Sequence, residues 1–403
     1  MENNKNPNIR FKGFTDPWEQ RKLGELVEIG DIDHRMPETV ADGIPYLMTG
    51  DFVGTNELNF DGTKMISEED YCQLSQKIKP EKGDILFARY ASVGAARYVD
   101  FTRKFLISYS CAIIKKSKKI NSKYLYHFIT SDNAQQQIKL EINTGSQANI
   151  GISSMKNHIV VSMPPLGEQT KIADALSNLD HLITLHQRKY NKLLNVKKSM
   201  LEKMFPKNGS NIPEIRFKGF TDPWEQRKLG DCFTERVESM PDGELISVTI
   251  NDGIKKFSEL GRHNNSNDDK SKYKKVCIGD IAYNSMRMWQ GASGYSPYEG
   301  IVSPAYTVLS PNSGINSKCL AYQFKLPEMI HTFQINSQGI TSDNWNLKYP
   351  ALSEIEIFVS KNEKEQAKIA EYFEGLDRLI TLHQRELEKL QYIKKSMLEK
   401  MFV

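Results

Sequence analysis

The stretch EQTKIADALSNLDHLITLHQR, residues 168–188, returns as EQAKIAEYFEGLDRLITLHQR at residues 365–385. The nonapeptide KKSMLEKMF at residues 197–205 also recurs, unchanged, at residues 394–402. Both repeats have the same spacing, because 365 − 168 and 394 − 197 each equal 197. Two unrelated helices would not share this sequence and spacing, so the chain contains one element twice.

Large, mostly apolar residues in each copy recur at alternating steps of four and three, the heptad pattern of a coiled-coil seam. In the first copy they are Ile172, Leu176, Leu179, Ile183, His186, Tyr190 and Leu193, continuing at Lys197, Met200 and Met204. In the second copy they are Ile369, Phe373, Leu376, Ile380, His383, Leu387 and Leu390, continuing at Lys394, Met397 and Met401. Each helix would run roughly 55–60 Å, too long and too one-sided to be stable alone. We predict that the two helices pair, with the polar seam residues setting their alignment. The alternative is two amphipathic helices in separate cores.

A second repeat lies ahead of each helix. The block IRFKGFTDPWEQRKLG occurs at residues 9–24 and again at residues 215–230, an offset of 206, so the whole chain is a tandem duplication. The offsets differ by 206 − 197 = 9, so the second unit is nine residues shorter. We expect Trp18 and Trp224 in this block to be buried. The preceding Asp-Pro pairs favour a turn and a helix start, with proline at the first helical position.

The segments between the repeated blocks differ, yet they keep short landmarks in the same order. These are Gly-Asp-Ile at 83–85 and 279–281, and Asn-Ser-Lys at 121–123 and 316–318. Short β-branched and aromatic runs alternate there with glycine and asparagine turns, which predicts a mostly β domain with a few helices. Residues 123–131 and 318–333 are candidate helices.

These observations predict an α+β chain with two globular domains and two long helices. The predicted parts are a first domain at 1–165, a first helix at 166–206, a linker (PKNGSNIP, 206–213) with a second domain at 207–361, and a second helix at 362–403. Helix one delivers the chain to the second domain and helix two must point back, so the pair is expected to be antiparallel and related by a pseudo-two-fold axis. Met401–Val403 should then finish near the front of the first domain.

Composition narrows the class of protein. The formal net charge is +4, which does not by itself announce a nucleic-acid binder, and the five cysteines form no C-x-x-C pair. No signal peptide and no apolar run of membrane-spanning length is present, so we expect a cytoplasmic protein. Phosphate-binding loops, dinucleotide fingerprints, methyltransferase tetrapeptides and paired metal-ligand motifs are also missing from the sequence. We therefore expect no catalytic residue, metal or bound cofactor.

Repeated ends around divergent middles suggest two matched docking surfaces for copies of one partner, together with two different recognition domains. A linear target with unequal halves, such as double-stranded DNA, would suit this arrangement. Arginine suits guanine, while asparagine and glutamine suit adenine. The predicted DNA-binding residues are Arg89, Tyr90 and Ser92; Ser146, Gln147 and Asn149; Asn284, Arg287, Trp289 and Gln290; and Thr341, Ser342 and Asn344. For each, the alternative is a solvated loop residue.

The chain resembles the specificity (S) subunit, HsdS, of type I restriction-modification systems. The features that carry the resemblance are the repeated front block, the Gly-Asp-Ile strands, the helix entry PPLGEQTKIADAL at 164–176 and the repeated helix. The resemblance covers essentially the whole chain. It departs at the second helix entry, where Ser360-Lys361-Asn362 stands in place of a second Pro-Pro, which leaves the exact start of that helix open.

The resemblance implies two α/β target recognition domains that each read half of a split DNA sequence. It implies that the coiled coil measures the spacer and docks two modification (M) subunits, which use S-adenosylmethionine to methylate adenine. Two restriction (R) subunits using ATP and Mg would join for cleavage. Two alternatives remain: a scaffold that binds two protein copies without reading DNA, and a self-sufficient nuclease or methylase.

Overall fold

The computed structural model describes residues 7–145, 147–207, 209–250, 253–261, 263, 266, 268–340 and 344–402. It divides into two compact units. Unit 1 comprises the chain up to Lys189 together with the residues from His383 onward, and unit 2 comprises Tyr190–Leu382. The long helices α6 (Leu166–Met204) and α11 (Glu363–Met401) therefore each contribute residues to both units.

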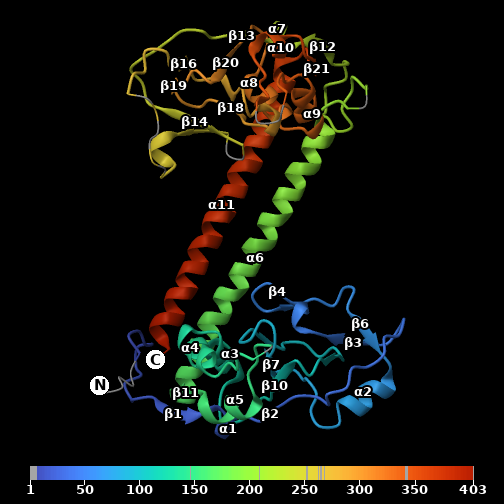
Figure 1. Ribbon diagram of the computed structural model, residues 1–403, viewed down its shortest axis with the longest axis vertical. Helices are drawn as coiled ribbons and strands as arrows, with labels where there is room; N and C mark the ends of the chain where they lie inside the picture. Colours follow the sequence, from blue (N-terminus) through green and yellow to red (C-terminus); the bar gives the residue numbers. More distant parts are fainter. Residues whose placement is uncertain are drawn as a thin grey trace. The chain divides into compact units, whose positions relative to one another are not determined.

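Unit 1 contains mostly short strands, with helices concentrated in its second half (Figure 1). Its strands are β1 (Glu19–Lys22), β2 (Ile29–Gly30), β3 (Ile44–Leu47), β4 (Phe52–Val53), β5 (Glu57–Leu58), β6 (Lys64–Ile66), β7 (Ile85–Ala88), β8 (Ala96–Tyr98), β9 (Leu106–Ile107), β10 (Cys111–Ile114) and β11 (Val160–Met163). Its helices ahead of α6 are α1 (Leu23–Leu26), η1 (Thr49–Asp51), α2 (Glu68–Leu74), α3 (Ser122–Ile129), α4 (Asp132–Leu140) and α5 (Ile152–His158).

Unit 2 repeats this order with local differences. Its strands are β12 (Glu225–Lys228), β13 (Phe233–Glu235), β14 (Ile246–Thr249), β15 (Gly253–Lys256), β16 (Lys274–Val276), β17 (Ile281–Asn284), β18 (Ser293–Tyr295), β19 (Gly300–Val302), β20 (Tyr306–Pro311) and β21 (Glu356–Val359). Its helices ahead of α11 are α7 (Leu229–Cys232), η2 (Phe257–Glu259), η3 (Met288–Gln290), α8 (Ser317–Gln323), α9 (Pro327–Ile335) and α10 (Tyr349–Ser353).

A four-stranded antiparallel sheet forms the centre of each unit. The strand order is β2-β10-β7-β8 in unit 1 and β13-β20-β17-β18 in unit 2. Central pairs such as Leu86 with Ile113 and Ala282 with Val308 are fully buried. The mixed helix and sheet content is the α+β class that the sequence predicts.

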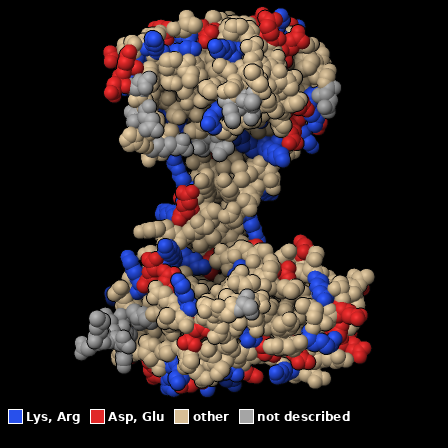
Figure 2. All heavy atoms as spheres, in the orientation of Figure 1, with Lys and Arg blue, Asp and Glu red and all other residues tan. Residues whose placement is uncertain are grey.

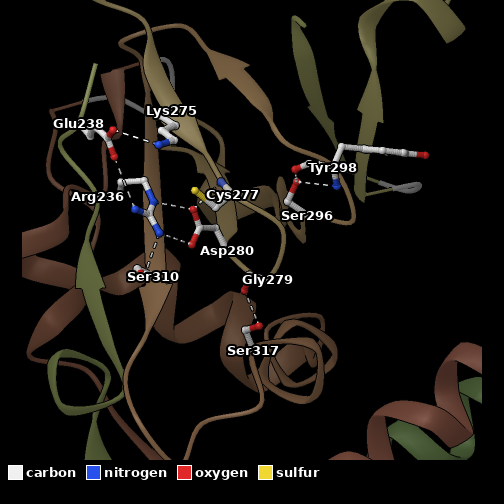
Figure 3. A network of polar contacts seen from close by, with 10 residues as sticks. All are labelled: Arg236, Glu238, Lys275, Cys277, Gly279, Asp280, Ser296, Tyr298, Ser310 and Ser317. Carbon is white, nitrogen blue, oxygen red and sulfur yellow. Dashed lines mark hydrogen bonds and ion pairs between the residues drawn. The ribbon is translucent and has the colours of Figure 1, made fainter. Parts of the chain in front are cut away.

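The repeated Gly-Asp-Ile landmark marks the entry to the central strand. Gly279 adopts a left-handed φ of +98°, which favours glycine, and Asp280 is 1% exposed. Its carboxylate accepts hydrogen bonds from the Cys277 amide at 2.8 Å and the Arg236 Nε at 2.7 Å (Figure 3). In unit 1, Asp84 likewise accepts bonds from backbone amides and a lysine. The landmark therefore fixes the start of the central strand through a buried aspartate whose carboxylate accepts several hydrogen bonds.

The front block packs against the start of the long helix of its own unit. In unit 1, Arg10 donates two hydrogen bonds to the Glu168 carboxylate, at 3.0 and 2.7 Å, and the Trp18 indole donates a third at 3.1 Å. Glu168 is completely buried and Trp18 is 1% exposed. The main chain adds a bond from the Ile9 amide to the Lys400 carbonyl, at 3.2 Å. This bond confirms that the chain end returns to the front of the first domain; Val403 itself lies outside the described residues.

Unit 2 builds the same anchor from the repeated residues. Arg216 donates to Glu365 twice at 2.8 Å, and the Trp224 indole donates to it at 3.2 Å. Ser360, which stands where unit 1 has proline, adds a hydroxyl donor to the same carboxylate at 2.5 Å. The burial of both tryptophans is confirmed.

Two local predictions were wrong. Trp18 and Trp224 do not begin helices: each precedes a strand, because β1 pairs with β11 and β12 pairs with β21 along the whole length of each strand. The predicted helix at 318–333 is two helices, α8 and α9, separated at Phe324–Leu326, with Pro327 at the first turn of α9. Proline at that place favours a new helix start over continuation.

Helices α6 and α11 pack together within each unit. In unit 1, Asp180 pairs with Lys394, and His186 lies 3.1 Å from His383 between their Nδ1 atoms. The partner number falls as the first number rises, so this pairing is antiparallel. In unit 2, Phe205, just past the end of α6, packs on Phe373 of α11. The predicted seam residues are all buried or partly buried.

Candidate nucleic-acid interface

In unit 1 the structure brings together the two predicted DNA-binding loops. The loop after β7 and the loop before α5 are joined by a β-bridge between Tyr90 and Asn149. The Ile150 amide also donates to the Arg89 carbonyl at 3.1 Å. The two segments, far apart in sequence, therefore form one paired-loop surface.

Arg89 has a structural position in this surface. Its side chain is 7% exposed, and it donates to the Ile150 carbonyl at 3.0 Å and forms an ion pair with Asp31. Asp31 also contacts His34 at 2.9 Å. The guanidinium thus joins β2, β7 and the second loop. Contact between Arg89 and a base stays a prediction, and it would require this guanidinium to leave a buried ion pair.

The remaining predicted residues of unit 1 are more accessible. Ser92 and Gln147 are exposed, and Tyr90 and Asn149 are partly buried. The Asn149 amide donates to the Gln147 carbonyl at 2.9 Å, which shapes the second loop. Ser146 lies outside the described residues. The loops predicted in unit 1 are thus accessible and paired, and the buried side chain of Arg89 supports them.

Unit 2 has a corresponding paired-loop surface made from different side chains. The loop after β17 meets the loop before α10 through the Leu347 amide, which donates to the Ser285 carbonyl at 2.9 Å. Trp289 and Trp345 contact each other edge to face, with ring centroids 5.2 Å apart. Both indoles are partly exposed, and Arg287 is exposed.

The other predicted residues of unit 2 lie around this tryptophan pair. Asn284 ends β17 and accepts a hydrogen bond from the Met286 amide at 3.0 Å. Gln290 is partly buried and Asn344 is exposed, while Thr341 and Ser342 lie outside the described residues. Trp345 was not among the predicted residues, although it directly follows the predicted Asn344; an aromatic residue in a glycine-led polar loop was the available signal.

The charge distribution does not single out one basic patch on the face in view. Figure 2 shows lysine and arginine interspersed with aspartate and glutamate. Among the described residues, no cluster of three or more histidine, cysteine or acidic side chains could hold a metal ion. In the same part of the chain, no helix is long and apolar enough to span a membrane.

A buried polar network in unit 1 connects the globular part to both long helices. His127 of α3 is 1% exposed; its Nε2 lies 3.2 Å from the Ser177 hydroxyl and its Nδ1 lies 3.9 Å from Asp180. Asp180 forms an ion pair with Lys394 at 2.5 Å. Burial, with the nearby charges of Lys394 and Lys123, lowers the pKa of His127 to about 3.

Unit 2 has the same network with tyrosine in place of histidine. The Tyr322 hydroxyl donates to Asp377 at 2.9 Å, and Asp377 pairs with Lys197 at 2.5 Å. Asp377 and Lys197 are the repeat counterparts of Asp180 and Lys394. Only the unit 1 network therefore contains an imidazole, whose pKa burial lowers in the folded protein.

We expect acid to destabilise unit 1 through His127. The pKa of this imidazole is about 3 in the folded protein against an ordinary value of 6.5, so the unfolded chain binds more protons between these values. The free energy of unfolding should fall as pH drops through this interval, by about 1.4 kcal/mol per pH unit. Urea unfolding between about pH 7 and about pH 5 measures this slope.

The matched variant is His127→Tyr, which copies unit 2. Its hydroxyl could donate to Asp180 as Tyr322 does to Asp377. The variant should retain the fold and lose the part of the slope that comes from residue 127. Identical slopes for the variant and the wild-type protein would contradict the assignment.

Comparison with known proteins finds one family twice along the chain. The protein family described as "Type I restriction modification DNA specificity domain" matches residues 15–195 and 221–392, which together make up most of the chain. A curated relative from Methanocaldococcus jannaschii, named as a specificity subunit of type I restriction enzyme MjaX, is 24% identical over 234 residues. That match covers 54% of this chain and 52% of the relative, so the chain spans about half the length of the curated relative.

Solved structures match over a longer stretch. The crystal structure of the S subunit of a type I restriction-modification system from M. genitalium has a TM-score of 0.59 at 17% identity, with 99% of both chains covered. The HsdS subunit from Thermoanaerobacter tengcongensis aligns at 15% identity with a TM-score of 0.42, covering 97% of this chain and 98% of that one. The first of these similarities establishes the fold.

Proposed function

The chain belongs to the type I restriction-modification DNA specificity family, and from this premise we propose that it is the non-catalytic sequence-reading subunit of such a complex. In this proposal, each paired-loop surface reads one half of a bipartite DNA target. The observation that carries it is the paired-loop surface itself, which recurs at equivalent places in both units with different side chains.

The chemistry of the two surfaces supports reading of unlike half-sites. Unit 1 offers hydroxyl, amide and phenol groups, whereas unit 2 offers Arg287, an amide and a tryptophan pair. Amide side chains pair with adenine and arginine pairs with guanine in the major groove, while aromatic rings stack on bases or pack on sugars. Phosphate contacts alone would not need such differences, because they carry no sequence information directly.

We propose that α6 and α11 set the spacer between the two half-sites. Each helix has 39 residues and contributes to both units. A rigid pair of helices would hold two reading surfaces at a fixed separation, and DNA would then be recognised as two half-sites with a fixed gap. In this proposal, residues 1–165 and 207–361 are the recognition domains, and residues 166–206 and 362–403 form the coiled coil.

We propose the outer faces of these helices as docking surfaces for two M subunits. Within the repeated sequence LITLHQR, Leu182 and Leu185 are 42% and 37% exposed, and their counterparts Leu379 and Leu382 are 45% and 51% exposed. Exposed leucines on a helix that already has a buried seam are consistent with a further partner. The duplication would give one such surface per M subunit. S-adenosylmethionine would be bound by the M subunits, and ATP with Mg by two R subunits.

A scaffold that binds two protein copies without reading DNA is the second candidate. The interspersed charge in Figure 2 and the net charge of +4 favour it. A gel shift with random DNA and with target DNA, with and without the M subunit and at a stated salt concentration, separates the candidates. A sequence-selective shift that depends on the M subunit is expected for the sequence reader, and its absence would favour the scaffold.

The decisive experiment exchanges residues 25–165 for another recognition domain of the family. We expect one half of the methylated sequence to change, while the other half and methylation of adenine persist, because each unit has its own core and its own paired-loop surface. Methylome sequencing of cells that express the hybrid with the M subunit gives the result. A change in both halves, or in neither, would refute the proposal.

A further inference from the structure

Lys325 lies in the short connection between α8 and α9, and its ammonium group is turned into unit 2. Its Nζ donates to three backbone carbonyls: Ile250 at 3.1 Å, Gly291 at 2.7 Å and Ser293 at 2.8 Å. A lysine ammonium has three N–H donors, so these bonds use its full capacity. A surface lysine would leave its donors in water.

The three carbonyls belong to the segments that shape the second paired-loop surface. Gly291 closes η3, the turn that carries Trp289, and adopts a left-handed φ of +82°. Ser293 begins β18, and Ile250 directly follows β14. The ammonium therefore joins the end of the reading loop to a neighbouring hairpin.

Unit 1 supports its corresponding loop with a different residue. Gln135 of α4 donates from its amide nitrogen to the Gly94 carbonyl at 3.0 Å and to the Ile129 carbonyl at 2.7 Å. Gln135 lies fourteen positions after the helix-capping residue Asn121, and the residue fourteen positions after the equivalent cap Asn316 is Ile330.

Ile330 cannot replace the glutamine as a donor. Its side chain packs under Gly291, where an added Cβ would lie 3.3 Å from the Ile330 Cδ1. Unit 2 therefore has an apolar contact at the place where unit 1 has an amide, and the loop carbonyls are bonded from Lys325 instead. The equivalent position in unit 1, nine residues after Asn121, is Thr130, whose hydroxyl donates to the His127 carbonyl.

We propose that Lys325 is a positioning residue that fixes the second reading loop, Asn284 to Gly291, and thereby sets the specificity of the second half-site without touching DNA. Gln135 has the matching role for the first loop. The anchoring of the loop stands on the contacts above, and the effect on specificity rests on the proposed function.

The contacts and the charge of Lys325 lead us to expect that the loop is sensitive to its substitution. Burial, followed by the nearby charge of Lys197, lowers the pKa of Lys325 to about 8. The group thus remains mostly an ammonium at neutral pH, with all three donors available. Removing it leaves three carbonyls without this donor. The bonds to Gly291 and Ser293 are partly buried and the bond to Ile250 is exposed, so the carbonyls of the loop lose most.

Hydrogen exchange on the full-length chain tests the anchor without DNA. We expect Lys325→Met to speed exchange of the amides of Gly291, Ala292 and Ser293 about tenfold or more, because the partly buried hydrogen bonds that hold this segment are lost. Exchange within α8 should stay as in the wild-type protein, which reports that the domain is folded. Lys325→Gln, which retains two donors, should show an intermediate effect, and Lys272→Met, which removes an exposed lysine of the same unit, should show none.

Methylome sequencing with the M subunit tests the effect on specificity. We expect Lys325→Met to relax the base preference of the second half-site about tenfold and to leave the first unchanged, whereas Gln135→Leu should do the reverse. Unchanged exchange of the loop amides in Lys325→Met would overturn the anchor. Faster exchange with an unchanged second half-site would overturn the effect on specificity. If the wild-type complex methylates DNA without any bipartite preference, the proposed function is contradicted. The exchange result would still decide whether Lys325 anchors the loop.

Discussion

Replacing Glu168 with alanine is expected to lower the free energy of unfolding of unit 1 by about 3–5 kcal/mol, the usual cost of removing one partner from a buried ion pair. The Glu168 carboxylate is completely buried and accepts bonds from Arg10 at 3.0 and 2.7 Å and from Trp18 at 3.1 Å. Its removal leaves the Arg10 guanidinium, with only 13% of its side chain exposed, without its carboxylate partner. Urea unfolding followed by tryptophan fluorescence measures the loss, because Trp18 lies in the network.

Matched variants separate the charge from the packing. Glu168→Gln keeps an acceptor for the Trp18 indole and should lose less stability than Glu168→Ala. A double variant, Arg10→Met with Glu168→Leu, removes both charges together and should recover much of the loss, since apolar replacement of a buried pair is often nearly neutral. A loss below about 1 kcal/mol in Glu168→Ala would place this carboxylate among weak surface pairs. Glu365→Ala should have the same effect on unit 2, where Arg216 and Trp224 form the matching network.

These networks supply a physical reason for part of the sequence repetition. The sequence alone suggests that identical ends meet an identical partner twice. Within each unit, the identical ends also meet each other, because the front block binds the start of the long helix through arginine, glutamate and tryptophan. An internal contact of this kind requires both repeated blocks to be retained together. The duplication was therefore visible in the sequence, but one of its causes was not.

Periodicity predicted the long helices well because a heptad seam is a local and repeated signal. Leu176 and Phe373, both predicted seam residues, are fully buried. The sheets were less accessible to sequence reasoning because their pairings are distant in the chain. Glu19 pairs with Met163, and this pairing turned a predicted helix start into a strand.

The paired-loop surfaces show a similar limit. Glycine-led polar segments and the strand ends indicated loops that the structure pairs within each unit, since turn chemistry is local, while DNA contact by these loops stays a prediction. The burial of Arg89 against Asp31 depends on a contact across 58 positions, and the support of Gly291 by Lys325 joins segments 34 positions apart. Residue type alone therefore suggested arginine as a reader and gave no signal for the lysine.

Removing one heptad from each long helix is expected to shorten the recognised spacer without changing either half-site. Residues 187–193 and 384–390 are deleted together. The ion pairs of Asp180 with Lys394 and of Asp377 with Lys197 can still form, because all four residues lie outside the deleted segments. Seven helical residues span about 10 Å, which corresponds to about 3 base pairs at about 3.4 Å each. Methylome sequencing of the double deletion with the M subunit should therefore reveal the same two half-sites about 3 base pairs closer together.

The control for this deletion removes the heptad from one helix only. Loss of 187–193 alone shifts one seam against the other and breaks the antiparallel register, so methylation should fall sharply rather than move to a new spacer. The double deletion restores a matched seam, and recovery of methylation at a shorter spacer would tie the helix length directly to the DNA gap. If the complex with the double deletion still methylates sites that have the original spacer, the helices do not set the gap. The separation of the half-sites must then be determined by the M subunits or by the DNA.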